Sequence, residues 1–448
     1  MRDDRHSRIT SAAEAFSRLV LFHRVLDTAP AQAMKGFLDT AMRGESPDSV
    51  EQKYLELVRI LYDESGTAST RALVDDAWQN HLLCQLLSDE NAMTMGAAFD
   101  ALDDTTLQAA THDLRLLQSL FELSGQVCRE MAASEGDPAD LPLWPRLRVS
   151  SGEEEADPSV VSAKSIASEL TGSADWADMA ERLENHFRQA GAGLPGTHWY
   201  LRWDGSALRG VARPNVFHIE DLIGLQDAKT AVLGNTEQFL DGVPANNLLL
   251  YGSRGTGKSS MVRGLISRYG ARGLRLVEIA RGCIGSLPSL FPVLRRYPQR
   301  FVIFLDDLSF DESEVDFKAF KSDMEGALEQ RPDNVLLYAT SNRRHLVPER
   351  WSDRHTPETA EVHGQDAMEE KLSLADRFGL TVYFTTPDQD EYLAIVEHMA
   401  ARRGLKIDRT RLREAALQWI MWNNPRSGRS ARQFVDDLAG KLMGGAAE

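Results

Sequence analysis

Hydrophobic and polar residues follow two different periods along this chain. Over residues 8–132, apolar residues recur three and four positions apart, as in Leu114, Leu117 and Phe121, which is typical of amphipathic helices. Glycine, proline and polar residues at 44–47, 66–69 and 103–105 mark breaks between these helices. Residues 1–132 are therefore predicted to form an all-helical N-terminal domain.

The pattern changes in the middle of the chain. Residues 133–165 contain Pro138, Pro142, Pro145 and the acidic run Ser-Gly-Glu-Glu-Glu-Ala-Asp-Pro at 151–158, which predicts a linker. A helix is expected from about Ser165 to Ala190. Alternation of apolar and polar residues over 199–211, around Asp204-Gly205, then predicts a hairpin. Residues 166–213 are thus expected to be a helix plus a β-hairpin.

Short apolar runs separated by helical stretches follow from residue 214. The expected strands are 247–251, 274–279, 301–305, 335–340 and 381–384. Near-continuous apolar runs such as Phe-Val-Ile-Phe-Leu at 301–305 are typical of strands buried on both faces, and hence of a parallel sheet. We expect an α/β domain at 214–387 and a small helical lid at 388–448.

Composition restricts the possible classes of protein. The 448 residues contain no apolar run long enough for a membrane span, and the N-terminus lacks the apolar core of a secretion signal. Three scattered cysteines suit a reducing compartment, so a cytoplasmic protein without membrane contact is expected. Most of the formal net charge of −17 falls in the first half, which disfavours nucleic-acid contact there. The basic stretch 251–300 is interpreted mainly as a phosphate site with solvated helix faces.

The strand at 247–251 runs into a glycine-rich loop. Gly252, Gly257, Lys258 and Ser259 fill the pattern G-x-x-x-x-G-K-[ST]. Glycines let successive N–H groups turn towards phosphate oxygens, Lys258 adds positive charge for the outer phosphates, and the Ser259 hydroxyl can ligate Mg²⁺. The remaining residues expected to line the phosphates are Ser253, Arg254, Gly255, Thr256 and Ser260.

Polar side chains end the next two central strands. Asp306 and Asp307 follow the apolar run at 301–305, where a carboxylate can hold Mg²⁺ through water and a second can orient or deprotonate the attacking water. Asn342 ends the following strand and could hydrogen-bond both the water and the γ-phosphate. Taken alone, such an asparagine is more often a turn residue.

With these motifs in order, residues 214–448 resemble an AAA+ ATPase module, a P-loop NTPase with a parallel sheet and helical lid. The match includes box II (Asp221-Leu-Ile-Gly-Leu), Walker A at 252–259, Walker B at 301–307 and sensor 1 at Asn342. It continues through an arginine-finger box at 373–379 and a sensor 2 helix at 427–434. Several phrases are similar to a bacterial AAA+ family of unknown function, among them Pro-Ala-Asn-Asn-Leu-Leu-Leu-Tyr-Gly at 244–252.

The resemblance implies ATP and Mg²⁺ as ligands and assigns further roles. Ile223 and Gly224 match the box that contacts adenine, and Arg377 matches the finger that enters a neighbouring subunit's site, which implies a homo-oligomer. Arg432 best matches sensor 2, with Arg429 as the alternative. The catalytic set is then Asp307, Asn342, Arg377 and Arg432, with Ser259 and Asp306 at the metal.

Function is less sharply specified than fold. Most AAA+ ATPases end Walker B in Asp-Glu, whereas Asp306-Asp307 resembles the slowly hydrolysing replication-initiator branch. The favoured hypothesis is an oligomeric ATPase that switches or remodels a protein partner selected by the helical domain. The alternatives are a nucleic-acid loader or initiator, and a non-hydrolysing nucleotide-gated scaffold. The segment 280–288 lacks the aromatic residue of a threading pore loop.

Overall fold

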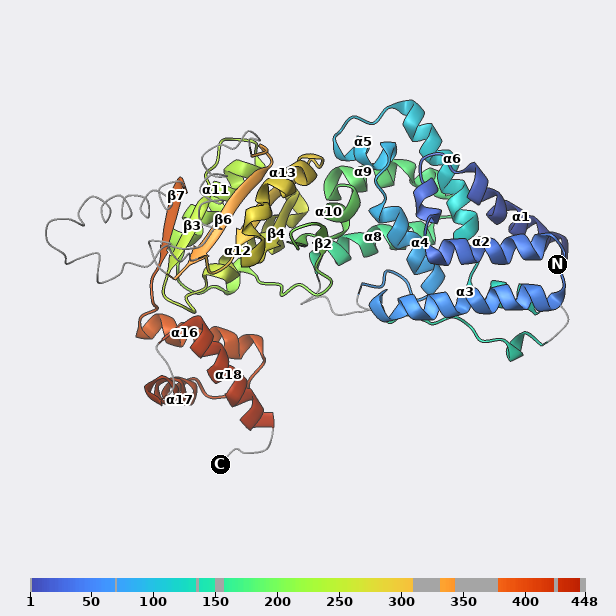
Figure 1. The fold of residues 1–448 in the computed structure, drawn as a ribbon. Helices are drawn as coiled ribbons and strands as arrows, with labels where there is room; N and C mark the ends of the chain where they lie inside the picture. The colour runs from blue at the N-terminus through green and yellow to red at the C-terminus, as the bar shows by residue number, and fades with distance from the viewer. Residues whose placement is uncertain are drawn as a thin grey trace, which may run out of the picture. The chain divides into compact units, whose positions relative to one another are not determined.

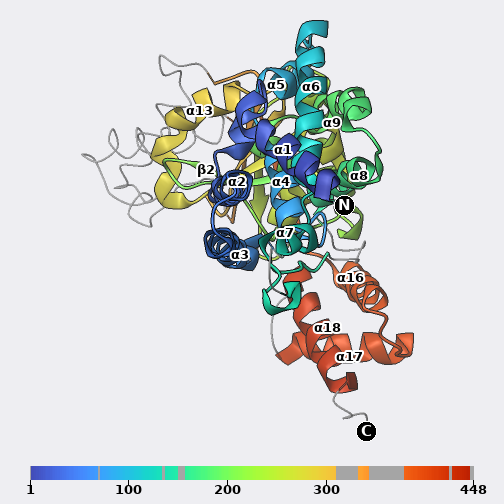
Figure 2. The ribbon, with the colours of Figure 1, turned by 90° about the vertical axis from the view of Figure 1, so that its right-hand side faces the viewer.

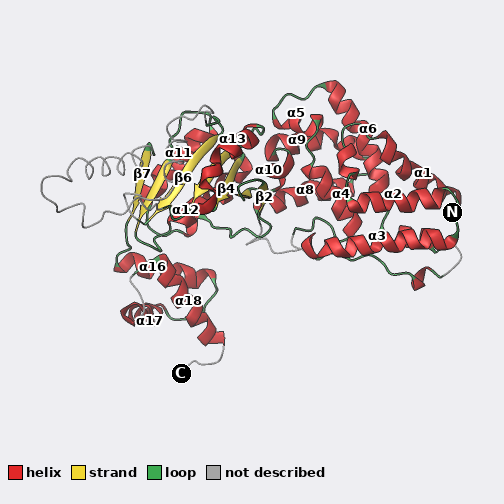
Figure 3. Cartoon of the chain, in the orientation of Figure 1, coloured by secondary structure: helices red, strands yellow, loops and turns green. Residues whose placement is uncertain are grey.

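The computed structural model describes residues 2–68, 71–133, 137–149, 157–308, 331–342, 378–422 and 426–443. These residues form two compact units. The first comprises Met1–Trp199, Gly210–Pro214 and Tyr297–Gln299, and the second comprises Tyr200–Arg209, Asn215–Arg296 and Arg300–Glu448. Helices fill the first unit, whereas the strands belong to the second (Figure 3).

The first unit is an assembly of amphipathic helices, as the apolar spacing predicts. Its helices are α1 (Arg2–Arg18), α2 (Ala29–Met42), α3 (Pro47–Ala68), α4 (Ala77–Ser88), α5 (Ala92–Ala98), α6 (Asp104–Phe121), α7 (Gly125–Ala132), α8 (Pro158–Gly172), α9 (Ala180–Ala190) and α10 (Gly193–Thr197) (Figure 1). Side-chain caps fix several helix starts; Asp76, for example, accepts hydrogen bonds from the N–H groups of Trp78 and Gln79.

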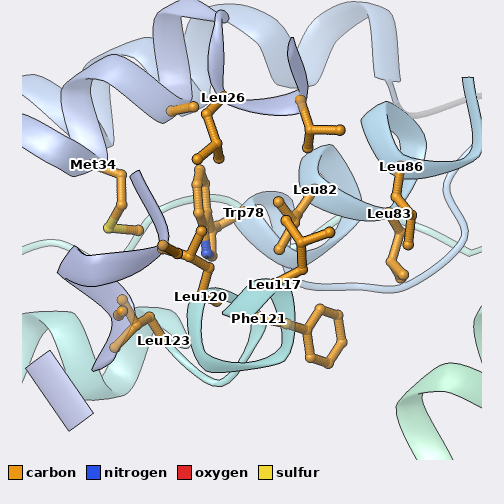
Figure 4. Close-up of a cluster of buried hydrophobic side chains, with 14 of the residues drawn as sticks. Leu26, Met34, Trp78, Leu82, Leu83, Leu86, Leu117, Leu120, Phe121 and Leu123 are labelled. Atoms are coloured by element: carbon orange, nitrogen blue, oxygen red, sulfur yellow. Dashed lines mark hydrogen bonds between the residues drawn. The ribbon is translucent and has the colours of Figure 1, made fainter. Parts of the chain in front are cut away.

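Trp78 lies at the centre of the helical core. Its fully buried ring is surrounded by leucines from α4 and α6, together with Leu26 and Met34 (Figure 4). The indole N–H donates to the carbonyl of Leu120 at 2.9 Å, so the one polar atom of the ring is satisfied inside the core. The turn after α1 is held by the buried Asp113, which accepts from three successive backbone N–H groups, those of residues 20–22.

The second unit is built on a seven-stranded sheet with the order β2-β1-β4-β5-β6-β3-β7. Its strands are β1 (Tyr200–Trp203), β2 (Leu208–Gly210), β3 (Leu248–Gly252), β4 (Leu274–Ile279), β5 (Arg300–Leu305), β6 (Val335–Ser341) and β7 (Leu380–Phe384), and its helices are α11 (Gln226–Leu240), α12 (Lys258–Tyr269) and α13 (Leu287–Arg295). The neighbouring strands β1 and β4, β4 and β5, β5 and β6, β6 and β3, and β3 and β7 all pair in parallel. The carboxyl ends of the strands therefore meet at one edge of the sheet.

Three helices complete the second unit. They are α16 (Gln389–Arg402), α17 (Arg409–Trp422) and α18 (Gly428–Met443), drawn in red in Figure 2. Tyr392, Val396, Ala416 and Phe434 belong to a core of their own. Asp388 opens α16 with a capping box, since it accepts from the N–H of Glu391, whose side chain accepts from the N–H of Asp388. These helices are the predicted lid.

The five expected strands are confirmed to within one residue at either end, and the fold has the predicted parallel α/β sheet and all-helical N-terminal region. Three expectations differ from the structure. Residues 158–165, expected in the linker, begin α8, because Asp157 caps that helix and Pro158 suits its first position. The helix expected from about Ser165 to Ala190 is two helices, α8 and α9, because the chain turns at Ser173–Asp175 and a short 3₁₀ segment follows. The hairpin strand β1 also adds to the main sheet beside β4, with Tyr200 paired to Leu276.

Candidate nucleotide-binding site

The loop between β3 and α12 has the backbone of a phosphate-binding loop. Gly252, Gly255 and Gly257 all have positive φ angles, of 142°, 78° and 99°. A Cβ atom on Gly252 would lie 2.2 Å from the carbonyl oxygen of Phe384 in β7, so glycine is required there by both conformation and space. Thr256 closes the turn by donating to the carbonyl of Ser253 at 2.9 Å. The loop then delivers the chain to the N-terminus of α12.

Lys258 is the first residue of α12 and is almost fully buried, with 7% of its surface exposed. Its Nζ donates to the carbonyls of Gly252 and Ser253 at 2.8 and 2.7 Å, and to Oδ1 of Asn342 at 3.3 Å. Burial lowers the pKa of Lys258 below its ordinary value, although the carboxylates of Asp307 and Asp306 partly offset that effect. A positive charge is thus held inside the loop.

Asp306 receives hydroxyl donors from two sides. Ser259 of α12 and Thr340 of β6 each donate to its Oδ1 at 2.6 Å. The geometry follows from the sheet, because β5 and β6 are neighbours with Leu305 paired to Ala339. The hydroxyl and carboxylate are hard oxygen ligands of the kind Mg²⁺ prefers alongside phosphate oxygens and water. Within the described residues, no group of three or more His, Cys, Asp or Glu could hold a metal alone.

Asp307 has an unusual backbone conformation, with φ of 54° in the left-handed region. Its N–H donates to the Thr340 hydroxyl at 2.8 Å, and its Oδ1 accepts from Nδ2 of Asn342 at 2.6 Å. Asn342 therefore bridges Lys258 and Asp307. These two hydrogen bonds hold the Asp307 carboxylate beside the loop, at a point where the backbone has left the direction of the strand.

Box II packs against the phosphate loop. Gly224 and Leu225 have left-handed φ angles of 73° and 58°, which turn the chain into α11. Leu222 lies 3.2 Å from where a Cβ of Gly257 would be. Asp221 accepts from His398 at 3.2 Å and also pairs with Arg402, so the first lid helix is tied to this segment. Ile223, expected at adenine, lies between these contacts and is partly exposed.

Arg429 and Arg432, the two candidates for sensor 2, lie at different distances from the phosphate loop. The N–H of Gly428, at the start of α18, donates to the carbonyl of Gly255 at 3.0 Å. Arg429 follows directly, and its Cβ lies 3.2 Å from where a Cβ of Gly255 would be, whereas the guanidinium of Arg432 lies 5.6 Å from the centre of the Phe217 ring. The alternative Arg429, rather than Arg432, is therefore next to the loop. Arg377 lies outside the described residues.

The remaining predicted residues belong to the same loop. Arg254 is exposed at its tip and Ser260 is the third residue of α12. Sequence reasoning missed two side chains, Thr340 and Arg263. A signal for each was present: Thr340 lies two positions before Asn342 on one strand face, and Arg263 lies four positions after Ser259 on one helix face. Arg263 reaches Oδ2 of Asp306 at 3.2 Å.

Comparison with known proteins identifies one matching family. A family model described as "Protein of unknown function (DUF815)" matches residues 196–442. No curated protein is similar enough to match the sequence. A search of the part of the chain that the structure describes finds no helix both long and apolar enough to span a membrane.

Similar solved structures share little sequence with the chain. The RuvB Holliday junction branch migration motor of Thermotoga maritima is 16% identical with a TM-score of 0.36, over 51% of this chain and 66% of that one. A chain of the E. coli MS115-1 HORMA:CdnC:Trip13 complex is 11% identical with a TM-score of 0.32, over 49% and 89%. A DNA replication initiation factor is 15% identical with a TM-score of 0.33, over 50% and 64%.

Proposed function

The chain belongs to the DUF815 family of proteins of unknown function, and we propose that it is a Mg²⁺-dependent ATPase that assembles into oligomers and switches a protein partner. The observation that carries the proposal is the meeting of Lys258, Asp306, Asp307 and Asn342 at one end of the sheet, within hydrogen-bonding distance of one another or of shared partners. A phosphate loop with a buried lysine, a hydroxyl, two carboxylates and an amide is suited to phosphoryl transfer to water.

The residues have separate tasks in this scheme. The loop N–H groups and Lys258 bind the phosphates, and Ile223 and Gly224 contact the base. Ser259 and Asp306 would hold Mg²⁺, which would supply positive charge against the phosphate oxygens. Asp307 orients the attacking water and accepts its proton, and Asn342 fixes the Asp307 carboxylate at 2.6 Å.

Lid and neighbouring residues complete the proposed site. Arg429 is the better candidate for sensing the nucleotide from the lid, because it adjoins Gly255. Arg377 of one subunit would stabilise charge on the γ-phosphate bound by the next, since arginine stays charged and offers a planar fork of donors. Assembly and nucleotide state would then depend on each other.

A protein partner is favoured over nucleic acid by the charges of the second unit. Three of the positive charges in the basic stretch 251–300 have acidic partners within the fold: Arg263 pairs with Glu278 and Asp306, Arg268 with Glu220, and Arg272 with Asp241. Arg275 is fully buried in β4. These four positive charges are therefore less available to a phosphate backbone. The nucleic-acid alternative requires salt-dependent DNA binding, and the scaffold alternative requires ATP binding without turnover.

The test is ATP turnover per subunit measured against protein concentration. An assembling ATPase with shared sites gives a rate that rises with concentration and falls strongly in Arg377→Ala. Mixing Arg377→Ala with Asp307→Asn should restore turnover, because one subunit type keeps the finger and the other keeps the carboxylate. Failure of every mixture would reject a finger acting between subunits, and ATP binding without turnover at any concentration would reject the ATPase.

A further inference from the structure

Arg263 places a positive charge on the carboxylate that is proposed to serve the metal. Ser259 and Thr340 both donate to Oδ1 of Asp306, and Nη2 of Arg263 lies 3.2 Å from Oδ2. Both oxygens of this carboxylate therefore have donors from the protein itself. A serine hydroxyl can ligate a metal through its lone pair and still donate its proton, but a guanidinium has no acceptor atom and only adds charge.

The same guanidinium nitrogen has a second carboxylate within reach. Nη2 of Arg263 lies 3.4 Å from Oε1 of Glu278, a residue near the end of β4. The two distances are nearly equal, so Asp306 and Glu278 share one guanidinium nitrogen, which carries two N–H groups. The guanidinium also lies 5.7 Å from the centre of the Phe304 ring, which limits where it can go. Glu278 and Phe304 are paired residues on neighbouring strands, so both are fixed by the sheet.

We propose that Arg263 and Glu278 form a positioning pair that sets the Mg²⁺ affinity of the nucleotide site, with Arg263 shared between Asp306 and Glu278 when no metal is bound and on Glu278 alone when it is. This inference rests on the proposed nucleotide site. A guanidinium beside Asp306 repels a divalent cation at the same carboxylate. Water screens this repulsion only in part, because the side chains of Arg263, Glu278 and Asp306 are only a quarter to a third exposed. Glu278 gives the displaced charge a partner.

The two residues should act in opposite directions. Arg263→Met removes the competing charge, so we expect the Mg²⁺ concentration at half effect to fall about ten-fold. Glu278→Gln keeps an acceptor oxygen but removes the second negative charge, which leaves Arg263 mainly on Asp306, so the same midpoint should rise about ten-fold. A purely structural role would not give changes of opposite sign.

The experiment is binding of a fluorescent ATP analogue to the full chain while free Mg²⁺ is titrated from a metal-free buffer. Arg268→Met is the matched control: Arg268 is also on α12, lies 5.6 Å from the centre of an aromatic ring and pairs with a glutamate, but at Glu220 rather than at Asp306. Arg263→Lys, which keeps the charge, should stay closer to the wild-type midpoint than Arg263→Met. Thermal unfolding of each variant checks that it is folded.

Different results would reject different claims. Equal midpoints for Arg263→Met and Arg268→Met, or a shift of Glu278→Gln in the same direction as Arg263→Met, would overturn the positioning pair. ATP binding by the wild-type chain that does not depend on Mg²⁺ would overturn it as well, while leaving the nucleotide site intact. Failure of the wild-type chain to bind the analogue with or without Mg²⁺ would reject the proposed function itself.

Discussion

Replacing Thr340 with valine tests whether one buried hydroxyl holds the Asp306 carboxylate and the Asp307 backbone in place. Thr340 is 1% exposed, and its hydroxyl donates to Asp306 at 2.6 Å and accepts from the N–H of Asp307 at 2.8 Å. Valine has nearly the same shape but can make neither bond. The substitution therefore removes the hydroxyl with little change in packing.

The expected loss of stability follows from the two hydrogen bonds. A hydrogen bond between neutral groups contributes about 0.5–1.5 kcal/mol, and one to a charged group about 1.5–3 kcal/mol. Because the Asp306 side chain is 30% exposed, water can replace part of the second, so we take the lower end of that range. Thr340→Val should then lower the free energy of unfolding of the second unit by about 2–3 kcal/mol. Thr340→Ser keeps the hydroxyl and should cost about 1 kcal/mol for the lost methyl group.

Urea unfolding of the full chain measures this difference. With two units, two transitions are expected, and the transition of the second unit is the one that moves to higher urea when ATP is added. Thr340→Val should unfold at lower urea than Thr340→Ser in that transition alone. If the two variants are equally stable within about 0.5 kcal/mol, an amount typical of a neutral surface change, the hydroxyl does not hold Asp306 and Asp307 in place.

Two further predictions concern the lid and the helical unit. Asp221→Asn should weaken the contacts of this residue with His398 and Arg402. We expect ATP affinity to fall several-fold with little change in the urea midpoint, because a surface ion pair contributes little to stability. Unchanged ATP affinity in a binding titration would argue against a role for this contact. Burial lowers the pKa of His186 and of His198 to about 4, so the folded first unit resists protonation between about pH 6.5 and pH 4, where unfolded histidine takes up a proton. The stability of the first unit should therefore be fully present above pH 6.5 and fall by roughly 1–2 kcal/mol per histidine by pH 5. The urea midpoint of the first unit, measured at pH 7.5 and at pH 5, tests this, and equal midpoints would contradict it.

The parts of the fold that local patterns determine were predictable from the sequence. Strands β3 to β7 follow from short apolar runs, and the phosphate loop follows from a motif whose glycines have the positive φ angles it requires. The parallel pairing of β1 with β4 was not predictable in this way, because Tyr200 and Leu276 are far apart in sequence and nothing local specifies that contact. A hairpin pattern predicts only its own two strands.

The candidate site shows the same division. Lys258, Asp306 and Asn342 are specified by motifs, and the structure brings them together. Thr340 and Arg263 matter through their distances to Asp306, which depend on strand order and on the face of α12 turned to the sheet. The choice between Arg429 and Arg432 likewise depends on where α18 begins relative to Gly255, which one-dimensional motif order does not determine.

ATP binding at the loop around Lys258 underlies every role proposed for the site, and calorimetric titration of ATP in the presence of Mg²⁺ measures it. Lys258→Met keeps the length of the side chain and removes its charge. Lys406→Met is the control, because Lys406 is exposed in the connection between α16 and α17. We expect the wild-type chain and Lys406→Met to bind ATP equally, and Lys258→Met to bind at least about 100-fold more weakly, a loss of about 2.7 kcal/mol. Equal ATP affinity in all three proteins, or no binding by the wild-type chain, would contradict it.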